Sequence, residues 1–464
     1  MSQITIIGGG VSGVFLAVQL MKSKTDLPLS ITLVEKEKEP WLGVAYSTDK
    51  PFHLLNVRAS RMSGLQGEDD HFLDWLHRHN YDTGPNDFAP RFVFRKYVED
   101  VLQTTLHEKP ANIEFTLLRN SVIDIKQINQ HEAAIYLNDG QQFVSNFIVL
   151  ALGNFTTNSP LTQDPALEGN DAYYDNPWAW NIFDDLKNDA RVVILGTGPT
   201  MIDTVLTLYR QKHKGQIVAL SRHGLIPAKH LLSETYPDFS NELKGITSLA
   251  EAVVIVRKHI DIAEKNGIGW RAVIDAMRPF TQSFWINFTL RAKKDFLKYY
   301  KTFWEVSRSR MPEECAMIIE KMIDERSLIV IPGRVTRFEK NGAEIKVVYK
   351  NNKSGAIDFL IADVVINCMG PGLNFEKIKD PLVESLVKQG LICNSPAAVG
   401  INALPDGTVL RKDGQPSDMM FTLGSLLRGV LWETIAIPEI RMQAQQLAAL
   451  IMQKTAATIT KINS

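Results

Sequence analysis

The stretch Ile4-Thr5-Ile6-Ile7-Gly8-Gly9-Gly10-Val11-Ser12-Gly13 joins a run typical of a β-strand to an apolar segment typical of a helix. Its Gly-x-Gly-x-x-Gly spacing gives each glycine a role. Gly8 permits a tight turn, Gly10 lets a pyrophosphate approach the backbone, and Gly13 lets the helix pack close to the strand. The start of the helix adds free N–H groups and a positive dipole end. The stretch therefore predicts a phosphate-binding turn.

A second predicted strand, Ser30–Val34, ends at Glu35, about twenty residues after the glycines. An acid at this place accepts hydrogen bonds from the ribose hydroxyls of a dinucleotide. The alternative is an ordinary surface acid, since charged residues follow from Lys36 to Glu39. The order of strand, glycines, helix, strand and acid favours the dinucleotide. We expect Val11, Ser12 and Lys36 to lie beside it.

The composition is that of an ordinary globular protein. The chain has 464 residues, of which 45% are hydrophobic and 22% charged, enough for roughly two or three domains. The net charge of -1 gives no indication of nucleic acid or an anionic membrane. No apolar run approaches the roughly 18 residues of a membrane span. The first strand begins at Gln3 or Ile4 with no basic segment before it, so we expect no signal peptide and a cytoplasmic location.

The cysteines and histidines predict neither a redox dithiol nor a metal site. The three cysteines are far apart in the sequence and form no Cys-x-x-Cys, which fits a reducing compartment. Cys368 follows a buried-type strand, and we interpret it as a small buried hydrophobe. No His/Cys cluster has the spacing of zinc ligands.

The stretch Arg191–Asp203 repeats the opening pattern of strand, Gly-x-Gly and helix, with Met201 in place of the third glycine. The next predicted strand ends at Ser221-Arg222, where the first unit has its acid. A hydroxyl and an arginine suit a 2′-phosphate, so this site predicts NADP rather than NAD. The alternative for Arg222 is a solvated surface charge. The predicted NADP contacts are Gly196, Thr197, Gly198, Pro199, Thr200, Ser221, Arg222 and Gly370.

Other segments predict the remaining parts of an α/β fold. Residues 67 to 107 and about 433 to 452 have helical patterns, and the aromatic residues of the first are expected in the core. Three predicted strands end in glycine, at Gly153, Gly370 and Gly424. Residues 230 to 327 predict a helical insertion, which is a partner or substrate surface or simply a structural cap. Asn138-Asp139-Gly140 predicts a hairpin turn.

Several stretches together resemble the two-dinucleotide-binding flavoproteins, and within them the uncharacterised FAD-NAD(P)-binding family that includes bacterial YdhS-like proteins. They are Gly43–Tyr46, Leu54–Val57, Gly196–Met201, Ser221–Pro227, Asn367–Gly370, Gly424–Ser425, Trp432–Thr434 and Pro438–Arg441. One departure is Ser307-Arg308-Ser309-Arg310, where relatives tend to have His-Arg-His-Arg. No role of those histidines is therefore carried over.

The resemblance implies an α/β protein with two Rossmann-like dinucleotide-binding domains, the second inserted in the first. Residues 1–180 would begin the FAD-binding domain, and residues 366–464 would complete it with a strand and a helix. Residues 185–365 would form the NADP-binding domain with its helical insertion at about 230–327. The implied flavin contacts are Ala45, Tyr46, Leu55, Asn56, Gly153, Gly424 and Ser425, in addition to Gly8, Gly10, Gly13 and Glu35 for the ADP half.

The function implied is that of an NADPH-dependent FAD oxidoreductase, most plausibly a monooxygenase. NADPH would reduce the flavin, and molecular oxygen would give a C4a-hydroperoxide that oxygenates a small nucleophilic substrate. Asn56 and Ser425 are the candidates for contacts to the flavin or its oxygen adduct, although Asn56 is also typical of a turn. The alternatives are a flavin reductase or oxidase, and a flavin-bound sensor or scaffold without catalysis. The patterns predict no oligomeric state.

Overall fold

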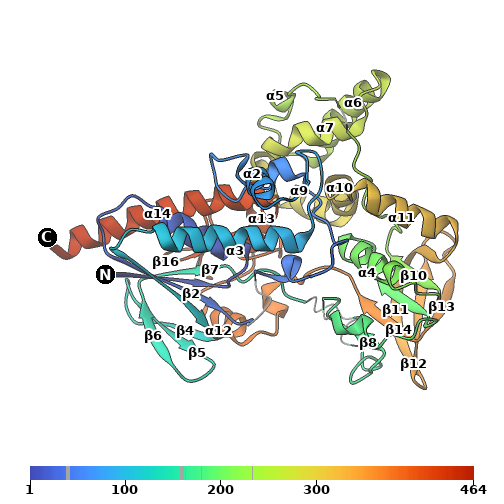
Figure 1. Cartoon of the computed structure of the whole chain (residues 1–464), viewed down its shortest axis with the longest axis horizontal. Coiled ribbons are helices and arrows are strands. Elements are labelled where there is room, and N and C mark those ends of the chain that lie inside the picture. Colours follow the sequence, from blue (N-terminus) through green and yellow to red (C-terminus); the bar gives the residue numbers. More distant parts are fainter. Residues whose placement is uncertain (38–41, 157–160, 162–163, 179, 233, 464) are drawn as a thin grey trace. The chain divides into compact units, whose positions relative to one another are not determined.

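The computed structural model describes residues 1–37, 42–156, 161, 164–178, 180–232 and 234–463 (Figure 1). The chain divides into two units: Met1–Asn154 with Leu373–Ser464, and Phe155–Gly372. The boundaries expected near residues 180 and 366 both fall inside the second unit. The reason is that β8 (Tyr173–Tyr174), from the expected linker, pairs with β14 (Val364–Asn367). Residues 157–160, 162–163 and 179 of that linker lie outside the described part of the chain.

The first unit is built on a six-stranded sheet in which β1 (Ser2–Ile7) has a parallel neighbour on each side. The sheet has the strand order β15-β16-β7-β1-β2-β3. The bounds are β15 Thr408–Leu410, β16 Pro416–Thr422, β7 Phe147–Leu150, β2 Leu29–Glu35 and β3 Ile113–Arg119. β15 pairs in the antiparallel sense, whereas the other pairs are parallel. The parallel strands therefore end at one edge, where ligands of open α/β sheets bind.

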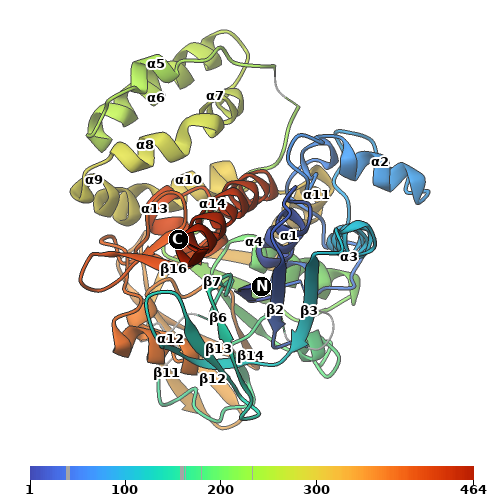
Figure 2. The same ribbon diagram turned by 90° about the vertical axis from the view of Figure 1, so that its left-hand side faces the viewer.

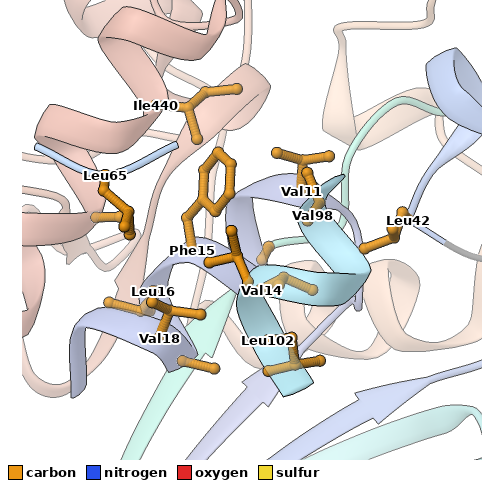
Figure 3. Packing of buried hydrophobic residues seen from close by; sticks show 14 of the residues in the cluster. Val11, Val14, Phe15, Leu16, Val18, Leu42, Leu65, Val98, Leu102 and Ile440 are labelled. Carbon is orange, nitrogen blue, oxygen red and sulfur yellow. The ribbon is translucent and has the colours of Figure 1, made fainter. Parts of the chain in front are cut away.

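Three helices cover this sheet with apolar side chains. The helix α1 (Val11–Met21) packs against α3 (Arg91–Glu108) and α14 (Ile437–Asn463). Figure 3 shows Phe15 and Ile440 between α1 and α14, and Val98 and Leu102 against α1. Most residues of α1 are buried, including Phe15 and Leu16 at 0% exposure. This packing fixes the direction in which the first turn of α1 points.

A small antiparallel sheet, β4-β5-β6, completes the first unit. Its strands are β4 Val122–Gln127, β5 Ala133–Leu137 and β6 Gln142–Ser145. The predicted hairpin turn joins β5 to β6, with Gly140 at φ +87°. The helix α12 (Pro381–Gln389) packs on β4, where Gln389 donates to Asp124 at 3.0 Å.

The second unit repeats the architecture with a seven-stranded sheet in the order β13-β12-β11-β10-β9-β14-β8. The bounds are β9 Val192–Leu195, β10 Ile217–Ser221, β11 Leu328–Asn341, β12 Glu344–Asn351 and β13 Ile357–Ala362. The strand β9 lies between β10 and β14 and is parallel to both. The helix α4 (Pro199–Arg210) follows β9 and packs against α11 (Glu313–Asp324). The predicted α/β class with Rossmann-like folds is confirmed.

The segment between β10 and α11 is helical, and Figure 2 shows α5 to α8 grouped together. It has a small core of its own around Phe239, Ala263 and Val273. The helices are α5 Ser240–Leu243, α6 Leu249–Lys265, α7 Trp270–Met277, α8 Thr281–Asn287, α9 Leu290–Asp295 and α10 Lys301–Arg308, with a π-helical turn at Phe296–Tyr300.

Two predicted helices differ from the structure. The segment predicted as helical from 67 to 107 forms α2 (His71–Arg78) and α3, because Asn80 at φ +60°, Pro85 and Pro90 interrupt it. Its aromatic residues are buried as predicted, with Phe72 and Tyr97 at 0% exposure. The last helix begins at Ile437 rather than 433, since Trp432 has φ +65°, and it continues to Asn463.

Candidate functional site

The first glycine turn has the geometry that its spacing predicts. Gly8 has φ +109°, and a Cβ there would lie 2.2 Å from the carbonyl oxygen of Ala151. A Cβ on Gly13 would lie 2.1 Å from the oxygen of Gly8, so helix and strand touch at this point. By contrast, a Cβ on Gly10 would meet no described atom within 4 Å. Gly8 and Gly13 are thus required by the fold, whereas Gly10 borders open space.

The first turn of α1 faces that open space with its backbone. Gly10 is the N-cap residue and no side chain caps the helix. The first intrahelical bond runs from Val14 N–H to the oxygen of Gly10 at 3.0 Å. The N–H groups of Val11, Ser12 and Gly13 therefore precede the ladder, at the positive end of the helix dipole. This arrangement suits a phosphate.

Glu35 is not an ordinary surface acid. Its side chain is only 7% exposed, and its Oε2 accepts from Gly9 N–H at 2.7 Å. Its Oε1 accepts from Glu37 N–H at 2.8 Å. Since a carboxylate has about four lone-pair positions, two remain for ribose hydroxyls. Lys36, next in the chain, is exposed.

The loop after β2 reaches the same turn. Gly43 has φ +85°, and its Cβ would lie 3.7 Å from the Cα of Gly10. Ala45 is exposed, whereas the ring of Tyr46 packs 5.1 Å from that of Phe94. Burial raises the pKa of Tyr46 well above its ordinary range, against a smaller effect of Arg91, so the phenol stays protonated.

Leu55 and Asn56, the other two residues expected to contact the flavin from this loop region, differ in burial. Leu55 is 4% exposed and belongs to the apolar core of the first unit, and its N–H donates to the oxygen of Ala89 at 2.9 Å. Asn56 is exposed. Of the pair, Asn56 is therefore the residue whose side chain reaches solvent.

Two expected strand ends are brought together. The hydroxyl of Ser425 donates to the oxygen of Gly153 at 2.7 Å. A Cβ on Gly424 (φ +73°) would lie 2.7 Å from Ser12 Oγ. The end of β16 therefore meets both the loop after β7 and the first turn of α1. Because its proton is used, Ser425 Oγ can accept from a ligand but not donate while this bond persists.

The structure also reveals a residue that no pattern in the sequence singles out. Gln443, in the second turn of α14, accepts from Gly424 N–H through Oε1 at 2.9 Å. It is 6% exposed. Nineteen positions separate it from Gly424, and the periodicity of a long helix does not distinguish it from its neighbours.

The second glycine turn repeats the geometry of the first. Gly196 has φ +102°, and its Cβ would lie 2.3 Å from the oxygen of Cys368. Gly198 is the N-cap of α4 and a Cβ there would meet no described atom within 4 Å. Pro199 opens the helix, and Thr200 follows it in the first turn. Met201 is fully buried, so a side chain is accepted where α1 has Gly13.

The side chains of Ser221 and Arg222 differ in how far they are already engaged in hydrogen bonds within the protein. Thr197 donates its hydroxyl to the oxygen of Leu225, so Ser221 Oγ donates to Thr197 Oγ1 at 2.8 Å and accepts from Gly224 N–H. Ser221 therefore holds the turn together. Arg222 is exposed, with a nitrogen 3.5 Å from Thr302 Oγ1 of α10.

The environment of Arg222 keeps its neighbour His223 neutral. Burial, and then the charge of Arg222, lower the pKa of His223. The unprotonated Nε2 accepts from Arg222 Nε at 3.0 Å. Arg222 is thus the permanent cation at the end of β10.

Cys368, beside the second turn, is a buried thiol as predicted. It is 5% exposed, and Thr204 Oγ1 lies 3.6 Å from its sulfur. Burial raises its pKa to about 12, so the thiolate is not populated at neutral pH. The following Gly370 is exposed, with φ +87°.

Neither a metal cluster nor a membrane helix is seen in the described ranges. Within them, no three His, Cys, Asp or Glu side chains are grouped as metal ligands. Likewise, none of the helices placed there has the length and hydropathy to cross a bilayer.

With this geometry in place, comparison with known proteins gives a family-model match in the first part of the chain. Residues 5–155 match the family model described as FAD-NAD(P)-binding. This part of the chain is similar to FAD-NAD(P)-binding domains. A search of curated protein sequences gives no match.

The whole chain has the fold of the two-dinucleotide-binding flavoproteins. L-lysine 6-monooxygenase from Pseudomonas syringae matches with a TM-score of 0.66 and 14% identity, over 98% of this chain and 100% of that one. An ornithine N-hydroxylase from Kutzneria sp. 744, in a structure with reduced FAD, NADP⁺ and L-ornithine, gives 0.62 and 13%, over 97% and 99%. Bacillithiol disulfide reductase from Staphylococcus aureus gives 0.55 and 13%, over 98% and 99%. At these identities, the likeness concerns the fold.

Proposed function

We propose that this protein is an NADPH-dependent FAD oxidoreductase, and specifically a monooxygenase that uses molecular oxygen on a small nucleophilic substrate. The observation that supports it best is the pair of glycine turns, each with an open glycine before an uncapped helix. One turn is completed by the buried carboxylate of Glu35 and the other by the exposed Arg222. This difference matches the difference between an adenosine ribose and its 2′-phosphate.

The residues of the first unit fit FAD. A cradle that a Cβ would fill lies at Gly10, and the N–H groups of Val11 and Ser12 lead into it. Glu35 would accept from the ribose, while Gly424 and Ser425 would line the opposite side of the turn. When bound, FAD supplies hydride transfer and oxygen chemistry, and the protein supplies orientation and exclusion of water.

The residues of the second unit fit NADPH. Gly198 leaves its N-cap position open, and the N–H groups at the start of α4 suit the pyrophosphate. Arg222 would pair with the 2′-phosphate, with Gly370 at the neighbouring strand end. Ser221 would contribute by shaping the turn, since its hydroxyl is already bonded to Thr197.

The kind of substrate follows by analogy. Two of the structural neighbours are named for ornithine and lysine, so small aliphatic amines are the first compound class to test. A dithiol reductase, which would work through a pair of its own cysteines, receives less support. The reason is that Cys315 and Cys368 are buried and Cys393, which is partly buried, has a raised pKa. We also propose a cytoplasmic setting, which suits three free cysteines.

The test is NADPH oxidation by the FAD-loaded protein in air, with and without a panel of amines, while peroxide and hydroxylated product are measured. We expect one amine to accelerate oxidation and to yield product in proportion to NADPH consumed. Oxidation that ends entirely in peroxide would indicate an oxidase. Absence of NADPH oxidation under every condition would favour a flavin-bound sensor or scaffold.

A further inference from the structure

The amide of Gln443 has a fixed orientation inside the first unit. Gly424 N–H is a donor, so the group facing it at 2.9 Å must be the amide oxygen. The amide nitrogen Nε2 then points away from Gly424. It is buried and has no hydrogen-bond partner among the residues that the structure describes. Such a buried donor is rare in proteins unless a ligand or water supplies the acceptor.

The position of this amide relates it to the phosphate-binding turn. Gly424 is the residue that Gln443 holds, and a Cβ on Gly424 would lie 2.7 Å from Ser12 Oγ. Ser12 belongs to the first turn of α1, whose N–H groups face open space at Gly10. Gly424 therefore contacts both Gln443 and the helix terminus that suits a pyrophosphate.

Two neighbouring polar side chains already donate to other groups, although Arg441 Nε has no partner among the described residues. Arg441, two residues before Gln443 in α14, donates to the oxygen of Ser63 at 3.2 Å and to Asp69. Ser425 donates to Gly153. Gln443 is the side chain that holds Gly424 and also has a buried donor without a partner among the described residues.

We propose that Gln443 is a cofactor-binding residue with two tasks, which rests on the FAD assignment above. Its Oε1 holds the turn at Gly424, and its Nε2 donates to a pyrophosphate oxygen of FAD. Because ADP contains the same pyrophosphate and no flavin, ADP and FAD must both sense this donor. The optical spectrum of bound flavin must not.

Replacing Gln443 by Glu separates the two tasks. Gln443→Glu keeps an oxygen that accepts from Gly424 N–H, but at pH 8 it removes the donor and places a negative charge toward the phosphates. We expect FAD and ADP to bind the apoprotein at least roughly tenfold more weakly, the range of one hydrogen bond to a charged group. The melting temperature of the apoprotein should stay close to that of the wild type. Affinities come from fluorescence titration of FAD and calorimetric titration of ADP.

Two further variants make the test specific. Gln445→Glu adds the same charge on an exposed position of the same helix and should leave both affinities unchanged. Gln443→Met removes donor and acceptor while keeping an unbranched side chain, and it should weaken both ligands and also lower the melting temperature of the apoprotein. If Gln443→Glu does not fold, Gln443→Met still shows whether FAD and ADP binding depends on Gln443.

The outcomes distinguish this inference from the proposed function. If both Gln443 variants bind FAD and ADP as tightly as the wild type, the role of Gln443 is overturned. A bound water, and not FAD, would then be the partner of Nε2 in the wild type. Loss of FAD affinity with unchanged ADP affinity would also overturn it, since the donor would then meet the flavin half. A wild-type protein that binds no FAD would instead overturn the proposed function itself.

Discussion

At the scale of single residues, Gly10 and Gly13 have opposite reasons for lacking a side chain. A Cβ on Gly13 would lie 2.1 Å from a backbone oxygen, whereas one on Gly10 would meet no described atom within 4 Å. Gly10 also has φ −62° and ψ 171°, which any residue adopts. The fold therefore tolerates a side chain at Gly10 but not at Gly13.

We therefore expect Gly10→Ala and Gly13→Ala to differ in kind. Gly10→Ala should leave the apoprotein as stable as the wild type or slightly more stable, by about 0.4–1 kcal/mol, because it restricts the unfolded chain. It should nevertheless weaken FAD binding, by roughly tenfold or more. Gly13→Ala should destabilise the apoprotein by about 1–3 kcal/mol, since overpacking outweighs the gain of about 1 kcal/mol in helix propensity.

Denaturant unfolding of the apoproteins and FAD titration check this pair. A Gly10→Ala protein with full FAD affinity would contradict the position of the pyrophosphate. Equal stability losses in both variants would contradict the geometry of the turn.

Arg222 makes a prediction about coenzyme choice. It is exposed at the end of β10 and its contact to Thr302 is long, at 3.5 Å, so it is available to a phosphate. Arg222→Ala should lower the affinity for NADPH by roughly ten- to a hundredfold, the equivalent of about 1.5–3 kcal/mol, and leave NADH unchanged. Titration with both coenzymes checks it. Ser221→Ala serves as a comparison, and a preference that depends on Ser221 alone would contradict this role of Arg222.

Some of the site residues could be predicted from the sequence, and others could not. Glu35 follows from its distance to the glycines, because both lie at neighbouring strand ends whose order the chain itself determines. The hydroxyl of Ser221 was expected to face a phosphate, but it is bonded to Thr197, a contact between two separate turns. Gln443 is placed by the packing of α14 on the first unit, which no local pattern encodes.

At the scale of elements, an ion cluster joins three strands of the second unit. Arg191, just before β9, donates to Asp363 through Nε at 2.9 Å and through its backbone N–H at 2.7 Å, and its guanidinium also pairs with Glu344 of β12. These bonds lower the pKa of Asp363 to about 2, below the ordinary value of an aspartate side chain. The cluster is partly exposed, so its contribution is small.

The sign of its pH dependence follows from this shift. A carboxyl whose pKa is lower in the folded state stabilises the fold above the unfolded pKa and loses that effect as pH falls toward the folded pKa. Asp363→Asn should therefore cost at most about 1 kcal/mol at pH 7, after allowance for exposure. The difference from the wild type should shrink between pH 4 and pH 2. Urea unfolding across this range measures it, and a difference that grows on acidification would contradict the assignment.

The prediction of elements succeeded where patterns were local and strong. The buried strands β1, β2, β9 and β14 are short β-branched runs, and they form as predicted. The strand β13 was not predicted, because it lies at a sheet edge with Ile357 and Phe359 more than half exposed and so shows no burial pattern. The break between α2 and α3 occurs where Asn80, Gly84, Pro85 and Pro90 interrupt the helical pattern, and these turn signals are local features of the sequence.

At the scale of the whole molecule, each unit has its own sheet and its own apolar core. We expect calorimetry to resolve two unfolding transitions, each sensitive to one ligand. FAD at a hundredfold its Kd should stabilise the first unit by about 2.7 kcal/mol, or roughly 5–10 °C for units of this size. NADP⁺ should raise the unfolding temperature of the second unit.

Variants assign the two transitions. Gly10→Ala should reduce the shift caused by FAD and leave that caused by NADP⁺ unchanged, whereas Arg222→Ala should reduce only the shift caused by NADP⁺. A single transition that both ligands raise equally would contradict independent units.

The division of the first unit between the two ends of the chain has a consequence for synthesis. The strand β16 and the helix α14 belong to the sheet and core of residues 1–154, yet they leave the ribosome after the whole second unit. The second unit is one continuous segment and is therefore able to fold while translation continues. The first unit cannot complete its sheet until β16 has been made, and until then β7 remains an unpaired edge strand. Gly424 and Gln443 are made after the second unit, so the growing polypeptide cannot form its complete FAD site until both residues have left the ribosome. A chain released early, at residue 372, would contain a folded NADP-binding unit attached to an unfinished flavin-binding one.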